Sequence, residues 1–488
     1  MIKVEDEADQ VLIAKVYRAG QEQVFRFWDS LDVRGREELL AQLRTIDFQE
    51  LAALDRLRAE QLEGAAPADL GERPEPPPIV GLPTDEESVK ERERALALGE
   101  SLIAEGKVAA FVVAGGQGTR LGWDHPKGTY PVGPVSGKSL FQLFAEQLKR
   151  RAERAGRAIP WIILTSSGNA AETRDFFKEH GDFGLPEGTV RFIQQRDLPV
   201  VDQRGKMLLS GPSKIAFSPD GHGGSLTALR RSGALEELSR RGVEHIFYWQ
   251  VDNPLCPVLD PVLLGYHADA QAEASSKVVA KTDPWEKVGV LGYIGPKLKV
   301  IEYSELDDDL RHARESENGP LRYRAGNIAV HVFRVDYLLE QTEDGVGLPY
   351  HLAHKVVPVV DKDGRTVRPE APNGIKFERF VFDVLADTKV HVTQEVDRAE
   401  EFAPLKNGDG ADSPETVRAA ILERSRRWLE QAGHELAAGR PVEVSPGLAL
   451  SPAGLAERLP EGWRAPDGDE PLHLDRESAS ESADQETS

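Results

Sequence analysis

The chain has 488 residues, a formal net charge of −22 at pH 7 and a single cysteine, Cys256. This length suggests two or three domains with room for a large buried core. The acidic balance argues against nucleic acid or an anionic membrane as a partner, because phosphate groups attract basic surfaces. A single cysteine cannot form an intramolecular disulfide, and no apolar run approaches the roughly 18 residues of a membrane span. The start, MIKVEDEADQ, lacks the features of a secretory signal. We therefore expect a cytoplasmic protein without an evident obligate protein partner.

The first 85 residues are expected to form a helical region and an extended strap. Residues 1 to about 65 place apolar side chains at helical spacing, as in Leu39, Leu43 and Ile46, and contain no strand-like stretch. The segment ADLGERPEPPPIVGLP that follows holds five prolines and cannot continue a helix.

Residues 86–410 alternate helical segments with apolar strands. The candidate strands that follow a first one at Lys107–Val113 are Trp161–Thr165, Val190–Gln194, His245–Val251, Lys277–Lys281, Val288–Ile294, Val300–Tyr303 and Ile328–Phe333. With right-handed connections, this order predicts an α/β fold built on a doubly wound, mainly parallel mixed sheet. Residues 411–462 are expected to form a small C-terminal α+β domain, and the acidic, Ser-rich stretch 463–488 a disordered tail.

A glycine-rich turn follows the first strand. Gly115, Gly116 and Gly118 are expected to adopt positive φ, so that successive backbone N–H groups point into one concavity and bind an anion. The spacing is one residue off the dinucleotide-binding pattern, and no P-loop Lys-Ser/Thr pair follows. Arg120 and Lys127 close the segment and favour a triphosphate ligand. The alternative is an ordinary strand-to-helix turn with surface cations.

Polar residues at the carboxyl ends of the predicted strands are candidate ligands, because ligands bind at that edge of an open α/β sheet. Asp252 follows His245–Val251 and could bind Mg²⁺, which takes hard oxygen ligands; the alternative is a structural Asp that caps the next turn. Gln195 could offer both a donor and an acceptor to a pyrimidine edge. The glycines of PDGHGG could let the backbone press against a flat base or sugar.

The segment AGGQGTRLGWDHPKG, followed by SGKSLFQLFAEQL, resembles the signature of sugar-1-phosphate nucleotidyltransferases, most closely that of the UDP-N-acetylhexosamine pyrophosphorylase family. The resemblance extends from about Val108 to Leu455 and implies a Rossmann-like nucleotidyltransferase fold. It also implies roles for matching positions. Arg120, Lys127 and Lys376 would be catalytic and Asp252 would bind the metal; substrate contacts would come from Val113, Ala114, Gly115, Gly116, Gln195, Gly221, His222, Gly289, Glu302, Tyr303, Asn327 and Lys406.

Within that resemblance, Gly289 matches the glycine that borders the N-acetyl group and is expected to leave room for it, and Glu302, Tyr303 and Asn327 match sugar-contacting segments. His222 departs from the asparagine that is typical of the family, which leaves the sugar contact at that position open.

The expected reaction is uridylyl transfer from UTP to a hexose 1-phosphate, with Mg²⁺ as cofactor. N-acetylglucosamine 1-phosphate is the expected acceptor. The attacking group is already a phosphate oxygen, so the chemistry needs cations and alignment and no protein nucleophile. Three alternatives stay open: a glucose- or galactose-1-phosphate uridylyltransferase, a catalytically inactive nucleotide-sugar-binding regulator, and a dinucleotide-dependent dehydrogenase.

Overall fold

The structure is a computed structural model that describes residues 2–63, 72–343, 347–437, 439–459, 463–466 and 468–479. The chain forms two units. The small unit consists of Met1–Asp69, Gln195–Thr227 and Gly347–Asp383, and the large unit of Leu70–Gln194, Ala228–Val346 and Val384–Ser488. Both units are therefore built from separated parts of the sequence. The predicted division into four consecutive parts, with boundaries at residues 85, 410 and 462, stays a prediction.

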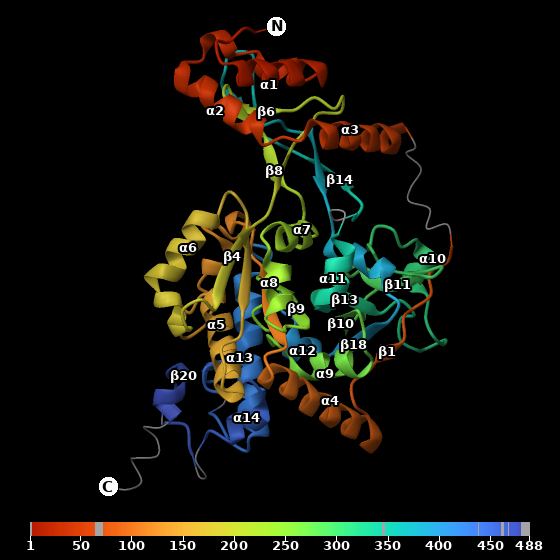
Figure 1. Ribbon diagram of the computed structural model, residues 1–488. Coiled ribbons are helices and arrows are strands. Elements are labelled where there is room, and N and C mark those ends of the chain that lie inside the picture. Colours follow the sequence, from red (N-terminus) through yellow and green to blue (C-terminus); the bar gives the residue numbers. More distant parts are fainter. Residues whose placement is uncertain are drawn as a thin grey trace. The chain divides into compact units, whose positions relative to one another are not determined.

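The large unit is organised around a ten-stranded sheet with the order β1-β18-β10-β13-β9-β2-β3-β4, in which β11 pairs with β13 and β12 (Figure 1). The strands are β1 (Ile79–Val80), β2 (Val108–Val113), β3 (Trp161–Thr165), β4 (Val190–Gln194), β9 (His245–Gln250), β10 (Ala274–Ala280), β11 (Val290–Ile294), β12 (Lys297–Ile301), β13 (Ala325–Arg334) and β18 (His391–Val396). All the candidate strands are present, two of them with the predicted bounds.

The sheet is mixed and mainly parallel, as predicted. β2 pairs in parallel with β3 and β9, and β3 pairs in parallel with β4, whereas β13 runs antiparallel to both β9 and β10. The carboxyl ends of β2, β3, β4, β9 and β10 consequently lie at one edge of the sheet. We call this edge the carboxyl edge.

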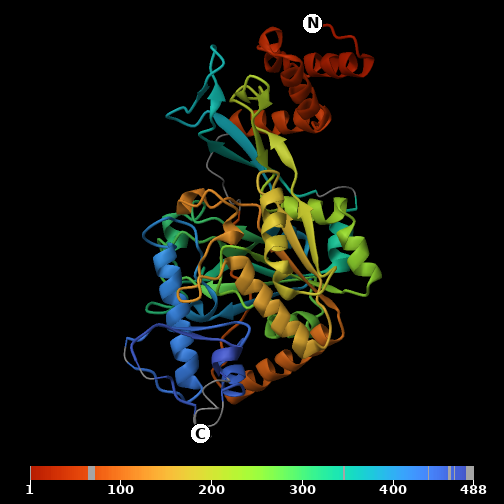
Figure 2. The same ribbon diagram turned by 90° about the vertical axis from the view of Figure 1, so that its left-hand side faces the viewer.

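Helices lie on both faces of the sheet (Figures 1 and 2). Those of the large unit are α4 (Glu86–Ala104), α5 (Leu140–Ala155), α6 (Ala170–Glu179), α8 (Ala234–Arg240), α9 (Pro261–Asp269), α10 (Asp308–His312), α11 (Val335–Gln341), α12 (Arg398–Glu401), α13 (Pro414–Gln431) and α14 (Pro452–Ala456), and α7 (Gly224–Arg231) continues from the small unit into the large one. No helix in these described ranges is both long and apolar enough to cross a membrane.

Helix α5 shows how local sequence signals build the core. The Ser139 side chain accepts a hydrogen bond from the Gln142 N–H at its start, and Gly156, with φ of 65°, ends it in the left-handed region. Its apolar stripe, which includes Phe144 and Leu148, is buried against alternate residues of the sheet such as Val112.

The small unit combines helices with short hairpins. Its helices α1 (Glu7–Arg18), α2 (Val33–Arg44) and α3 (Phe48–Glu63) occupy the predicted helical region. Its strands are β5 (Asp197–Pro199), β6 (Leu209–Gly211), β7 (Lys214–Ile215), β8 (Phe217–Pro219), β14 (His351–Lys355), β15 (Val359–Val360), β16 (Thr366–Val367) and β17 (Gly374–Glu378). Buried residues from all three sequence segments, among them Leu39, Leu198 and Phe377, form one apolar cluster.

The predicted disordered tail is partly ordered. Strand β20 (Leu472–Leu474) pairs in parallel with β19 (Val442–Val444), and both lie in one buried cluster with Trp463. The expectation was wrong for this stretch because the acidic composition masked a few apolar side chains that pack against the preceding helix and strand. Residues 480–488 of that tail lie outside the described residues.

Candidate active site

The glycine-rich turn leaves β2 at the carboxyl edge, but its glycines do not do what the sequence suggested. Gly115, Gly116 and Gly118 do not adopt positive φ; within this turn only Gly122 does, with φ of 68°. Gly118 is required for another reason, since a Cβ there would lie 2.8 Å from the Trp123 ring. A Cβ at Gly116 would meet no atom within 4 Å, so this part of the turn borders open space.

A buried asparagine holds the turn from behind. The Asn169 side chain is 1% exposed, and its Nδ2 donates to the Ala114 carbonyl at 2.9 Å and to the Gly116 carbonyl at 3.3 Å. Its Oδ1 accepts from the Ser166 N–H at 2.8 Å, which ties the asparagine to the end of β3. By contrast, the N–H groups of Gly115, Gly116 and Gln117 donate to no atom of the described residues. The turn thus presents unused donors, as an anion site requires.

Four predicted residues meet beside this turn. Lys127 Nζ donates to the Leu405 carbonyl at 3.1 Å, and the Leu405 N–H donates to the Asp252 carbonyl at 2.8 Å. Lys406 follows directly, and a Cβ at Gly408 would lie 2.9 Å from the Arg120 carbonyl oxygen. Burial lowers the pKa of Lys127; the Asp252 charge opposes this shift, and the Lys406 and Arg120 charges add to it.

The charges in this group do not neutralise one another. Among the residues that the structure describes, the side chains of Arg120, Lys406 and Asp252 form no ion pair and no hydrogen bond. Three cations therefore face one carboxylate, in a protein with a net charge of −22. Such a local excess of positive charge attracts polyanionic ligands.

Asp252 is the side chain that could hold a metal ion here. No group of three or more His, Cys, Asp or Glu side chains with metal-binding geometry occurs in the described ranges. Structural zinc sites usually take four protein ligands, whereas Mg²⁺ keeps several waters and takes further ligands from phosphates. One unpaired carboxylate among cations fits that donor set.

A second group of predicted residues lies where β11, β12 and β13 meet. Val290 is opposite both Ile301 and Gly326, so the flanking Gly289, Glu302 and Asn327 lie near one another. The Asn327 N–H donates to the Gly289 carbonyl at 2.9 Å. Tyr303 follows with 40% of its surface exposed. Strand β13 runs antiparallel to β9, with His331 opposite Tyr248. The first residues of β13, which include Asn327, therefore extend beyond the carboxyl end of β9, and Asp252 follows that end.

The bare backbone at Gly289 does not open a space. A Cβ there would lie 2.7 Å from Val300 Cγ1 and 3.5 Å from Glu302 Oε1. The expectation that this glycine leaves room for an acetyl group is wrong on its Cβ side, because Val300 already fills that side. Gly289 lets β11 approach β12 closely.

The remaining predicted residues, Gln195, Gly221, His222 and Lys376, belong to the small unit. Gln195 is 6% exposed, and its Nε2 donates to Asp220 Oδ1 at 3.0 Å and to the Gly221 carbonyl. Both N–H bonds of this amide are thus used inside the protein, and the expected donor to a base is not available. A contact through its oxygen stays a prediction. Burial raises the pKa of the neighbouring Asp220 to about 6.

The glycines around His222 pack against protein backbone. A Cβ at Gly221 would collide with the backbone of Arg379, and one at Gly223 would come within 2.7 Å of it. The His222 ring stacks on Phe380 with centroids 5.2 Å apart, and its Nδ1 accepts from the Val381 N–H at 3.1 Å. Burial lowers the pKa of His222 to about 4, so this ring is neutral at pH 7. Its role toward a sugar stays a prediction.

Lys376 lies on β17 opposite Ala353 of β14. Within the described residues it has no ion-pair partner. The catalytic role that the resemblance implies for Lys376 stays a prediction.

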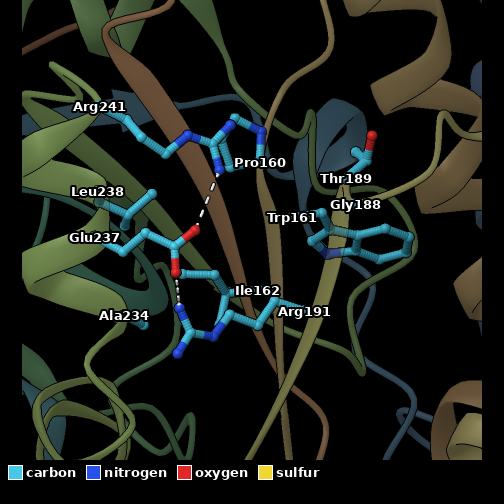
Figure 3. A pocket seen from close by; sticks show the side chains of 10 residues that line it. All are labelled: Pro160, Trp161, Ile162, Gly188, Thr189, Arg191, Ala234, Glu237, Leu238 and Arg241. Carbon is cyan, nitrogen blue, oxygen red and sulfur yellow. Dashed lines mark hydrogen bonds and ion pairs between the residues drawn. The ribbon is translucent and has the colours of Figure 1, made fainter.

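A cavity of about 220 Å³ lies at the opposite edge of the large sheet, beside the amino ends of β3 and β4 (Figure 3). Figure 3 shows Glu237 between Arg191 and Arg241, and it forms ion pairs with both, at 3.6 Å for Arg241. Because its charged side chains are already paired, and because ligands of open α/β sheets bind at the carboxyl ends, this cavity is not the candidate active site.

Sequence reasoning missed two buried asparagines that build the site. One is Asn169. The other is Asn253, 4% exposed, whose Nδ2 donates to the Glu401 carbonyl at 2.7 Å and whose Oδ1 accepts from the Ala403 N–H at 3.1 Å. It thereby holds the segment that carries Leu405 and Lys406. The position of each asparagine just after a strand was the available signal, but nothing local distinguishes it from an ordinary turn residue.

The mainly parallel sheet and the cation-rich group at its carboxyl edge define an α/β nucleotidyltransferase. The chain belongs to the family described as UTP--glucose-1-phosphate uridylyltransferase, which matches residues 82–451. It is 40% identical over 448 residues to a Xenopus tropicalis protein named UDP-N-acetylhexosamine pyrophosphorylase-like protein 1, covering 88% of this chain and 87% of the relative.

Two further comparisons agree with this family. The chain is 39% identical over 463 residues to the UDP-N-acetylglucosamine pyrophosphorylase of Saccharomyces cerevisiae, with 90% of this chain and 95% of that protein covered. The crystal structure of the uridine diphosphate N-acetylglucosamine pyrophosphorylase from Trypanosoma brucei is similar with a TM-score of 0.78 and 26% identity, covering 93% of this chain and 95% of that one.

Proposed function

We propose that this enzyme transfers the uridylyl group of UTP to a hexose 1-phosphate, and that N-acetylglucosamine 1-phosphate is the preferred acceptor. An oxygen of the sugar phosphate attacks the α-phosphorus of UTP, and the bond from that phosphorus to the oxygen of the β-phosphate breaks. The products are the UDP-sugar and pyrophosphate. No protein nucleophile takes part, so the protein has to align two polyanions and offset their charge.

The observation that carries this proposal is the group of cations without partners beside the glycine-rich turn. Lys127 is fixed by the Leu405 carbonyl, while Arg120 and Lys406 form no ion pair within the described residues. A triphosphate and a sugar phosphate supply the missing negative charge. Preorganised cations of this kind stabilise charge that moves toward the departing pyrophosphate.

The acceptor is inferred from relatives. The yeast protein is named for UDP-N-acetylglucosamine and the Xenopus protein for UDP-N-acetylhexosamine. Glucose 1-phosphate is the second candidate, because the description of the family names it. Where β11, β12 and β13 meet, Glu302 and Asn327 can form hydrogen bonds with the hydroxyl groups of the acceptor sugar, because carboxylate and amide side chains carry matching donor and acceptor atoms.

The proposal includes Mg²⁺, which Asp252 would hold together with phosphate oxygens. When bound, the ion would offset charge on the triphosphate and fix its orientation. Asp252 then has a second effect: its charge favours the protonated, cationic form of Lys127. A cytoplasmic location is also part of the proposal and is favoured by UTP as an intracellular substrate.

An assay of pyrophosphate release tests the function. The purified protein is incubated with UTP, Mg²⁺ and one of three acceptors: N-acetylglucosamine 1-phosphate, glucose 1-phosphate or galactose 1-phosphate. We expect release with UTP and the largest kcat/KM for the N-acetylated acceptor. Release with none of them would refute the proposed activity, and a larger kcat/KM for glucose 1-phosphate would replace the acceptor by the second candidate.

A further inference from the structure

The contacts of Asn169 with the glycine-rich turn determine which way that turn faces. Asn169 reaches two carbonyl oxygens, those of Ala114 and Gly116, from the buried side of the turn. The Lys127 N–H also donates to the Gly116 carbonyl, at 3.1 Å. The Ala114 carbonyl, however, has Asn169 as its one hydrogen-bond donor within the described residues. The asparagine is thus the part of the protein that fixes the first peptide group of the turn.

Peptide geometry converts these contacts into an orientation of donors. A trans peptide group is planar, and its C=O and N–H bonds point in opposite directions. When the Ala114 carbonyl points at Asn169, the N–H of Gly115 must point away from it. The same holds for the Gly116 carbonyl and the N–H of Gln117. These N–H groups are unused, and Gly116 and Gln117 are exposed, so the donors face the open side.

We propose that Asn169 is a positioning residue for the nucleotide. By holding two carbonyl oxygens behind the turn, it presents the N–H groups of Gly115 and Gln117 to oxygen atoms of UTP. It also keeps those carbonyl dipoles, which would repel a triphosphate, away from the ligand. This inference rests on the proposed function for the identity of the nucleotide, and it assigns a task to a side chain that touches no substrate.

Three variants distinguish the hydrogen-bonding role of the Asn169 side chain from its packing. Asn169→Asp keeps the shape but turns the donor into an acceptor that faces two carbonyl oxygens. Asn169→Ala removes the side chain, and Asn169→Ser keeps one small donor. If Asn169 only filled space, the alanine and serine variants, which both leave most of that space empty, would bind UTP with similar Kd values. If its N–H groups position the turn, the aspartate variant binds UTP most weakly and the serine variant least weakly.

The measurements are the Kd for UTP by calorimetry without acceptor, and the KM values for UTP and for the acceptor from pyrophosphate release. For Asn169→Ala we expect Kd and KM for UTP to rise about 10-fold, which equals a loss of about 1.4 kcal/mol and lies within the range for one buried carbonyl left unpaired. The KM for the acceptor should not change. A melting temperature is recorded for each variant.

Gln21→Ala is the matched control. Gln21 is 6% exposed, its Nε2 donates to the Gly205 carbonyl at 2.9 Å, and its Oε1 accepts from the Met207 N–H at 2.8 Å, all within the small unit. The Gln21→Ala variant loses buried hydrogen bonds comparable to those that Asn169→Ala loses. Its melting temperature should therefore fall, while the KM values for UTP and for the acceptor stay as in the wild type.

Two results would overturn the inference. One is a set of Asn169 variants with lower melting temperatures but unchanged Kd and KM for UTP. The other is an aspartate variant that binds UTP better than the alanine variant. If the aspartate variant does not fold, the same decision rests on alanine against serine. Failure of the proposed function is distinct, because the wild type would then bind no UTP and release no pyrophosphate.

Discussion

Replacing Lys127 by methionine should separate the charge of this residue from its packing. Lys127 is half-buried beside two further cations and one carboxylate, which leaves the group with an excess of positive charge. The lowered pKa of Lys127 means that its charged form is disfavoured by burial when no ligand is present. Methionine is of similar length and uncharged. Lys127→Met should therefore keep or raise the melting temperature of the ligand-free protein.

The same substitution should remove most of the activity. Losing one preorganised donor that offsets transition-state charge typically costs about 2.7–4 kcal/mol, which corresponds to a decrease of about 10²–10³ in kcat. The assay is pyrophosphate release with saturating UTP and N-acetylglucosamine 1-phosphate. Lys90→Met is the control, because Lys90 is exposed on α4 and pairs only with Glu86 in the described chain. A Lys127→Met variant that keeps more than about a third of the wild-type kcat would refute a catalytic role of this size. A large fall in its melting temperature would refute the argument from burial.

Three other outcomes can be measured on the same protein. Asp252→Asn should weaken the apparent affinity for Mg²⁺ together with activity, because an amide oxygen is a poorer ligand for a hard cation; unchanged metal dependence at full activity would return Asp252 to a structural role. The ratio of kcat/KM for N-acetylglucosamine 1-phosphate over glucose 1-phosphate should lie between about 10 and 200, the range that apolar contacts with one small substrate group supply, and a ratio below one would contradict the assigned acceptor. Stability should fall on acidification, since burial lowers the pKa of His245 to about 4 and that of His391 to about 3. At these two histidines the unfolded chain binds more protons than the native protein below about pH 6.5, which outweighs the opposite effect of the raised carboxyl pKa of Asp220, so the free energy of unfolding, measured with urea, decreases from there toward pH 4. A free energy that is flat over this window would contradict it.

Much of the large unit could be predicted from sequence, because its signals are local. Strands such as Trp161–Thr165 are short apolar runs that are buried on both faces, and α5 carries its cap, its apolar stripe and its terminal glycine within 18 residues of sequence. The succession of these elements then restricts the topology to a mainly parallel sheet. The placement of Asp252 just after a strand, and of Arg120 and Lys127 in the segment that follows β2, came from the same reasoning.

Only the tertiary structure decided how those residues are used. The glycines of the turn were expected to serve a ligand through positive φ, but Gly118 instead makes room for Trp123. Gly289 was expected to leave room for an acetyl group, but it makes room for Val300. Likewise, the Gln195 amide donates its hydrogen bonds to Asp220 and Gly221. A few apolar residues of the acidic tail are buried in a cluster with residues that precede them in the chain. These outcomes depend on the packing of side chains that the sequence does not place. The hydrogen bonds of Asn169 to a turn more than fifty residues before it are the clearest case. Composition and spacing determine which elements form and which residue types reach the carboxyl edge, whereas close packing and hydrogen bonding between distant segments determine which of their atoms remain available to a substrate.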